Sequence, residues 1–236
     1  MQVRIYPTKQ AVAEKFSIFF AQLIESNKNL NVALSGGSTP KIVFDYLAEH
    51  YAVLDWSKVH FYWGDDRCVL PTDAESNYKM TVEHLLSKIT IPAENIHRIK
   101  GENEPQEEAE RYSQVLSTTV TIENQIPKFD LVILGMGDDG HTASIFPYNI
   151  HLWDSEQNCV VATHPDSGQK RVSITGKIIN NAEIVTFLVT GASKAEKVKE
   201  IIKETSNFKD YPATRVKPSS KKLIWFLDED AARHIR

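Results

Sequence analysis

Short apolar runs alternate with helical patterns along most of this chain, and no other feature limits its fold so strongly. The runs expected to form strands cover residues 3–6, 31–34, 59–63, 129–134, 183–190 and 222–227. Strands that alternate with helices require crossover connections, and these favour a mostly parallel sheet with both faces covered. The expected fold class is therefore α/β.

The intervening helices can be placed by their end signals. They are expected over residues 9–26, from Thr39 to about residue 50, from Ser193 to 204, and after Asp228. Thr39 followed by Pro40 has the pattern of an N-cap and a first helical residue. Ser193 and Glu196 have capping-box spacing, and Asp228 can cap the closing helix. With its 236 residues, the chain is expected to form one Rossmann-like domain over 1–236, with helices on both faces of the sheet.

Composition excludes several classes of function. The net charge of −4 gives no basic field for nucleic acid, so an anionic ligand must be held by a local site. No apolar stretch approaches the roughly 20 residues of a membrane span, and the N-terminus lacks the apolar region of a secretory signal. Cys68 and Cys159 form no CxxC pair and are expected to be free thiols. A cytoplasmic protein is expected. The acidic segment 102–110 is expected to be a solvated helix start, with Pro105 near its first turn.

Four strand ends carry turns rich in glycine, hydroxyl groups or charge. These turns are 35–39, 64–67, 137–141 and 191–194. In parallel sheets of this kind, ligands bind beyond the carboxyl ends of the strands. The four turns are therefore expected to converge on one site.

The loop from Ser35 to Pro40 opens a helix with two glycines and two hydroxyl side chains. Free backbone N–H groups and the helix dipole make such a start an anion site, so Gly36, Gly37, Ser38 and Thr39 are candidate phosphate ligands. The Gly-Lys-Ser/Thr ending of a nucleotide P-loop is absent. A tight strand-to-helix turn with no ligand is the alternative.

Three cations are further candidates for an anion. Arg67 ends the turn that contains Asp65, and its planar fork suits a phosphate or a carboxylate. Asp65 can orient that guanidinium or hold substrate hydroxyls. Arg171 begins the run 171–175, and Lys194 stands at a helix start, where a cation is unfavourable unless an anion is near. Solvated surface cations are the alternative for Arg171 and Lys194.

The turn from Gly135 to Pro147 contains a literal Gly-x-Gly-x-x-Gly pattern, which is typical of dinucleotide sites. Asp138 and Asp139 would repel a pyrophosphate, and Pro147 follows too soon for the long helix that such a site needs. His141 suits proton transfer near neutral pH, and Asp139 can fix its tautomer. The turn therefore favours a hydrolase over a redox enzyme.

Three motifs together resemble 6-phosphogluconolactonase, and the match extends in order over most of the chain. The motifs are 33–40, 64–67 with 75–78, and 135–147, continued by 171–175 and 191–196. The resemblance implies a cofactor-free, metal-free cytosolic hydrolase of 6-phospho-D-glucono-1,5-lactone, in the second step of the oxidative pentose phosphate pathway. It implies catalysis by His141, Asp139 and Asp65. It also implies phosphate binding by the 36–39 loop with Arg67, Arg171 or Lys194.

The related glucosamine-6-phosphate deaminases are the nearest alternative. Their histidine turn continues to a carboxylate, which the segment 142–147 lacks, and their acidic motif ends in Tyr where this chain has Arg67. The lactonase family usually has Glu where this chain has Asp66, so the role of Asp66 stays open. A non-catalytic sugar-phosphate binder and a dinucleotide enzyme are further alternatives. The expected partner is the small sugar-phosphate lactone, without nucleic acid or membrane, and the protein is expected to be a monomer or a weak homo-oligomer.

In the expected mechanism, His141 takes a proton from the attacking water and returns it to the ring oxygen of the lactone. Asp139 orients the imidazole. Backbone amides near Gly137 are expected to stabilise the oxyanion.

Overall fold

A central parallel sheet organises the protein, for which a computed structural model describes residues 1–235. Its seven strands run in the order β1-β12-β11-β8-β2-β3-β5, and every neighbouring pair is parallel. The strands are β1 (Gln2–Tyr6), β2 (Leu30–Leu34), β3 (Val59–Trp63), β5 (Ile96–His97), β8 (Leu131–Leu134), β11 (Ile184–Val189) and β12 (Leu223–Asp228). The expected α/β class is confirmed. The fourth expected strand begins two residues later than predicted, and β5 was not predicted.

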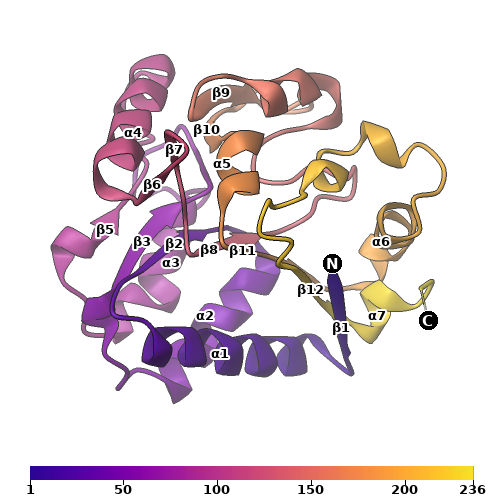
Figure 1. Cartoon of the computed structure of the whole chain (residues 1–236), viewed down its shortest axis with the longest axis horizontal. Coiled ribbons are helices and arrows are strands. Elements are labelled where there is room, and N and C mark those ends of the chain that lie inside the picture. Colours follow the sequence, from indigo (N-terminus) through magenta and orange to yellow (C-terminus); the bar gives the residue numbers. More distant parts are fainter. Residues whose placement is uncertain (236) are drawn as a thin grey trace.

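Helices connect these strands and cover both faces of the sheet (Figure 1). The helices are α1 (Lys9–Ser26), α2 (Ser38–His50), α3 (Asn77–His84), α4 (Pro105–Thr119), α5 (Gly176–Asn181), α6 (Ala195–Ile202) and α7 (Glu229–Ala232). On one face, Phe16 of α1 meets Phe226 of β12 edge-on, with ring centroids 5.3 Å apart. Trp225, the next residue back along β12, stacks on Phe187 of β11 at 4.0 Å. No helix among residues 1–235 is long and apolar enough to cross a membrane.

A second, antiparallel sheet stands beside the first and was not predicted. It has the order β4-β10-β9, with β4 (Asp65–Arg67), β9 (Cys159–Thr163) and β10 (Lys170–Ile174). The short β4 follows β3 after Gly64, so it carries the acidic turn away from the main sheet. Its register sets Arg67 directly opposite Arg171. A two-stranded ribbon of β6 (Ile122–Glu123) and β7 (Ile126–Pro127) completes the strands described.

Two predicted helix caps are wrong, each because a distant partner takes the hydroxyl group. Helix α2 begins at Ser38, and its N-cap is Gly37 with φ 107°, which a glycine tolerates. The Thr39 hydroxyl instead lies 2.8 Å from that of Thr190. Ser193 does not cap α6, which begins at Ala195, and its hydroxyl donates to Asp138 at 3.3 Å.

Other end signals agree with the structure. Asp228 caps α7 by accepting a hydrogen bond from the Ala231 amide at 2.8 Å. Pro105 opens α4, as predicted. The acidic start of α4 is not wholly solvated, however, because Glu108 is buried and bound by Arg111 at 2.6 Å. Cys68 and Cys159 are free thiols, and burial raises their pKa values to about 11 and about 12.

Candidate active site

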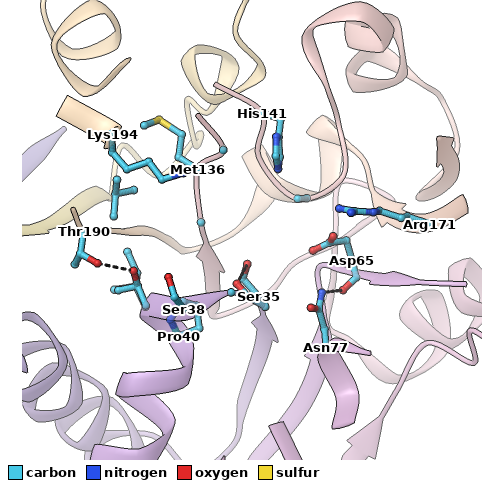
Figure 2. Close-up of a pocket in the computed structure, with 18 of the residues that line it drawn as sticks. Ser35, Ser38, Pro40, Asp65, Asn77, Met136, His141, Arg171, Thr190 and Lys194 are labelled. Carbon is cyan, nitrogen blue, oxygen red and sulfur yellow. Dashed lines mark hydrogen bonds between the residues drawn. The ribbon is translucent and has the colours of Figure 1, made fainter. Parts of the chain in front are cut away.

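The four turns meet around one cavity of about 260 Å³ at the carboxyl ends of β2, β3, β8 and β11 (Figure 2). The predicted residues that line it are Gly36, Gly37, Ser38, Thr39, Asp65, Arg67, His141, Arg171 and Lys194. Asp139 does not belong to the lining and reaches the cavity through His141. The expected convergence of the turns is therefore present in the fold.

The turn after β8 fixes the imidazole of His141. Its Nδ1 lies 2.6 Å from Oδ1 of Asp139, and the same oxygen accepts the His141 amide at 3.0 Å. Burial raises the pKa of Asp139, but the hydrogen bonds and charge of His141 outweigh burial and leave the pKa below its usual value. With Nδ1 donating to a carboxylate, Nε2 keeps its lone pair for a substrate in the cavity. This arrangement suits a general base.

Glycine at position 137 makes room for that imidazole. A Cβ built on Gly137 would lie 2.1 Å from Nδ1 of His141 and 2.7 Å from Oδ1 of Asp139. Real side-chain atoms do not approach so closely, so any larger residue must displace the His141–Asp139 pair. The glycine pattern thus serves the histidine rather than a pyrophosphate.

Three backbone amides of this turn, which is expected to stabilise an oxyanion, are engaged within the turn itself. The Gly137 N–H donates to the His141 carbonyl at 2.9 Å, and the Gly140 N–H donates to the Gly137 carbonyl at 3.1 Å. The His141 N–H is bound by Asp139. Gly137, Gly140 and His141 therefore offer no free amide to an oxyanion, and a role for the other amides near Gly137 stays a prediction.

The glycine-hydroxyl loop approaches the start of α3. A Cβ on Gly36 would lie 1.8 Å from Oδ1 of Asn77, so only glycine fits there. The side-chain amide of Asn77 also donates to the backbone carbonyl of Asp65 at 2.9 Å, which joins this loop to the acidic turn. Helix α2 has no side-chain cap, so its first amides remain open for an anion in the cavity.

Lys194 stands on the α2 side of the cavity (Figure 2). The pair of hydroxyls on Thr39 and Thr190 ties the start of α2 to the end of β11, just before the turn that carries Lys194. Nζ of Lys194 lies 2.7 Å from Oδ1 of Asp138. This ion pair lowers the pKa of Asp138. One exposed carboxylate therefore holds the cation beside the open helix start.

Arg67 and Arg171 form a pair of like charges on the opposite side. They face each other across β4 and β10, and the buried Nε of each has no hydrogen-bond partner among the described residues. Arg67 donates to the Glu75 carbonyl through Nη1. Burial, followed by the nearby Arg67, lowers the pKa of Arg171. Two partly desolvated guanidiniums with spare donors are prepared for an anionic or carbonyl oxygen.

Asp65 balances these cations and is positioned by a residue that the sequence reasoning missed. Its Oδ2 accepts a hydrogen bond from the Ser144 hydroxyl at 2.6 Å, in the buried interior. Ser144 and Asn77 both lie inside motifs that were recognised, but a short polar side chain gives no sign of its partner. Phe146 was missed as well: its ring lies 4.6 Å from His141 and beneath the Arg171 guanidinium at 5.7 Å.

Asp66, whose role was open, is a structural residue at the start of α3. It is buried, and its carboxylate accepts hydrogen bonds from the backbone amides of Asn77 at 2.7 Å and Tyr78 at 3.0 Å. Burial raises its pKa to about 6. The shorter Asp side chain thus reaches the amides that open α3 and does not line the cavity. Among residues 1–235, no group of three or more His, Cys, Asp or Glu side chains is arranged to hold a metal ion.

Comparison with known proteins decides the family. Residues 7–225 match the family of glucosamine-6-phosphate isomerases and 6-phosphogluconolactonase. The chain belongs to this family. It is 46% identical over 230 residues to the 6-phosphogluconolactonase of Haemophilus influenzae, covering 97% of both chains.

Solved structures agree with this family. The crystal structure of a protein named devB has a TM-score of 0.95 and 45% identity, covering 100% of this chain and 99% of that one. The 6-phosphogluconolactonase of Trypanosoma brucei has a TM-score of 0.90 and 27% identity, with 100% and 98% covered. The family includes both isomerases and lactonases, so the reaction of this chain must be argued from its site.

Proposed function

We propose that this chain hydrolyses 6-phospho-D-glucono-1,5-lactone to 6-phospho-D-gluconate, with His141 as general base. The observation that carries the proposal is the 2.6 Å contact between Asp139 and Nδ1 of His141 on the wall of a cavity lined by cations. We place the reaction in the cytoplasm, in the oxidative pentose phosphate pathway, and in one domain that spans the chain. The similarity to the Haemophilus influenzae enzyme supports this substrate.

The chemistry begins with proton transfer. Nε2 of His141 takes a proton from a water molecule as the water oxygen attacks C1 of the lactone. The resulting imidazolium is stabilised by Asp139. It then gives the proton to the ring oxygen as the bond between C1 and that oxygen breaks. The product carboxylic acid loses its own proton to solvent, and His141 is again neutral.

The two ends of the cavity support one direction of lactone binding. C1 and the 6-phosphate are separated by the ring oxygen, C5 and C6, so they contact different parts of the cavity. His141 and Arg171 both pack on Phe146, so they define one end. Ser38 and Lys194 lie at the other (Figure 2), where the Thr39 hydroxyl contacts that of Thr190. We therefore assign the phosphate to the start of α2 and Lys194, and the lactone carbonyl to the end with the arginines.

Arg171 is then the donor to the developing oxyanion, supported by Arg67. Its guanidinium lines the cavity, whereas the amides of Gly137, Gly140 and His141 are occupied within their own turn. Donors that are already in place as charge develops give the largest stabilisation in such reactions. Asp65 is the group that holds substrate hydroxyls, because its carboxylate lines the same cavity and is fixed by Ser144.

Deamination of glucosamine 6-phosphate is the second candidate, because the family contains both reactions. The segment 142–147 offers no second carboxylate to His141, and the acidic turn ends in Arg67. Both features favour the lactonase.

One assay separates the candidates. The purified protein is offered 6-phosphogluconolactone and glucosamine 6-phosphate side by side, with spontaneous lactone opening subtracted. We expect catalysed hydrolysis of the lactone and no release of ammonia. Ammonia release without lactone hydrolysis contradicts the proposal. Binding of lactone without turnover indicates a non-catalytic binder, and binding of NADPH indicates a dinucleotide enzyme.

A further inference from the structure

The histidine turn is held from behind by a segment far away in the sequence. The Ala213 N–H donates to the Gly140 carbonyl at 3.1 Å. A Cβ on Gly140 would lie 2.7 Å from Cβ and Cγ of Tyr211, so the Tyr211 side chain lies directly against the Gly140 backbone. Gly140 has φ 85°, which suits a residue without a side chain. The residue that precedes His141 is therefore fixed on two sides.

Tyr211 is itself fixed by α6. Its hydroxyl lies 2.6 Å from Nζ of Lys197, and the same Nζ stands 4.0 Å from the centre of its ring. Lys197 also binds Glu200 at 2.8 Å. These contacts together raise the pKa of Lys197, although burial acts against them. The ring of Tyr211 is thus held in one orientation against the turn.

We infer that Tyr211 is a positioning residue for catalysis: held by Lys197, it sets the backbone of Gly140 and so the placement of the His141 imidazole. The inference rests on the proposed role of His141 as general base. Tyr211 does not line the cavity within the described residues 1–235, so it is not expected to contact substrate. A misplacement of a catalytic group by about 1 Å can cost on the order of 10²-fold in rate.

The test compares substitutions at Tyr211 with a control in the same segment. Tyr211→Ala removes the ring from Gly140 and is expected to lower kcat by about 10- to 100-fold with KM little changed. Tyr211→Phe keeps the ring and loses only the hydroxyl contacts with Lys197 and Glu200, so a loss of about threefold or less is expected. Arg215→Met breaks an exposed ion pair with Asp154 and is expected to leave kcat unchanged.

A second readout separates positioning from general loss of stability. In wild type, proton NMR is expected to show a downfield signal from Nδ1–H of His141 bound to Asp139. In Tyr211→Ala this signal is expected to shift or broaden, while Arg215→Met retains it. The signal does not depend on substrate, so it tests the positioning even if the proposed reaction is wrong. If the Ala variant does not fold, Tyr211→Leu takes its place. A folded variant without the ring that keeps both wild-type kcat and the wild-type signal overturns the inference.

Discussion

Asp139 binds both the ring and the backbone of His141 through one oxygen, Oδ1, at 2.6 Å and 3.0 Å. The two residues are thus a single unit within one tight turn. The side chain of His141 is about a quarter exposed and faces the cavity, whereas Asp139 lies behind it. The turn therefore presents one ring nitrogen to substrate and commits the other to a carboxylate.

Asp139→Asn tests the need for that carboxylate. The amide keeps the shape of the side chain but has no charge to stabilise an imidazolium, and its NH2 group can donate to Nδ1 and so favour the other tautomer. We expect kcat to fall by about 10²-fold or more, within the range for a disabled general base. The steady-state rate of lactone hydrolysis measures this loss of kcat. Asp138→Asn is the matched control, since Asp138 contacts Lys194 and not His141, and kcat is expected to stay within a few-fold of wild type. Equal losses in both variants would contradict the account.

Gly137→Ala tests the space around the imidazole. The new methyl group would overlap Nδ1 of His141 and Oδ1 of Asp139, so the pair must move. We expect a folded protein with kcat reduced on the order of 10²-fold. Gly135→Ala is the control in the same turn, because the nearest atom to its Cβ is the Ser35 hydroxyl at 3.7 Å, an ordinary contact. Thermal unfolding verifies the fold of both variants, and a Gly137→Ala enzyme as active as Gly135→Ala speaks against this role for Gly137.

Lys194 and Arg171 are expected to contact different groups of the substrate, Lys194 the phosphate and Arg171 the lactone carbonyl. Lys194→Met is expected to raise KM for the phosphorylated lactone by about 10-fold or more, as removal of a charge-assisted contact implies. Arg171→Met is expected mainly to lower kcat, by about 10²-fold. Unphosphorylated glucono-1,5-lactone is the control substrate: the Lys194 variant should hydrolyse it like wild type, and the Arg171 variant should remain impaired. The reverse pattern places the phosphate on the arginines.

Protonation of Asp66 is expected to make the free energy of unfolding depend on pH. Its pKa in the folded protein is about 6, above the ordinary 3.8, because burial disfavours the charged carboxylate. The folded state therefore holds this proton more tightly than the unfolded state does. The resulting stabilisation is fully present below about pH 3.8 and is lost as the pH rises through about 6. At about 1.4 kcal/mol for each pKa unit, it amounts to about 3 kcal/mol.

The measurement is the free energy of unfolding of wild type relative to Asp66→Asn, which cannot titrate there. The free energy of unfolding of wild type relative to Asp66→Asn should increase as the pH falls from 7 to 4.5. Carbon NMR of the Asp66 carboxyl group should show a midpoint near 6. A midpoint below 4 means that the amides of Asn77 and Tyr78 outweigh burial.

The sequence was sufficient for six of the seven strands of the parallel sheet, because each of these strands is signalled locally by its own apolar run. The seventh, β5, spans only Ile96–His97 and was missed because it has no such run. Even the first helix has the expected bounds, Lys9–Ser26. The antiparallel sheet was missed because β4 spans only Asp65–Arg67 and its partner is distant β10. No local pattern distinguishes such a short polar strand from a turn.

The site shows the same division between local and distant information. His141 and Asp139 were predicted as partners because they lie two residues apart in one turn. Thr39 was assigned to a cap from its neighbours, but its hydroxyl binds Thr190, which no local pattern reveals. The contact of Tyr211 with Gly140 and that of Ser144 with Asp65 are equally remote in sequence. Contacts of this kind come from the packing of separate elements and appear only in the folded chain.

The central claim is that His141 is the general base for lactone hydrolysis, and the most direct measurement is kcat/KM of His141→Gln after subtraction of spontaneous lactone opening. The account predicts a protein that folds like wild type, binds 6-phosphogluconate, and hydrolyses the lactone about 10²- to 10⁴-fold more slowly. A folded His141→Gln variant with kcat/KM within a few-fold of wild type would contradict it.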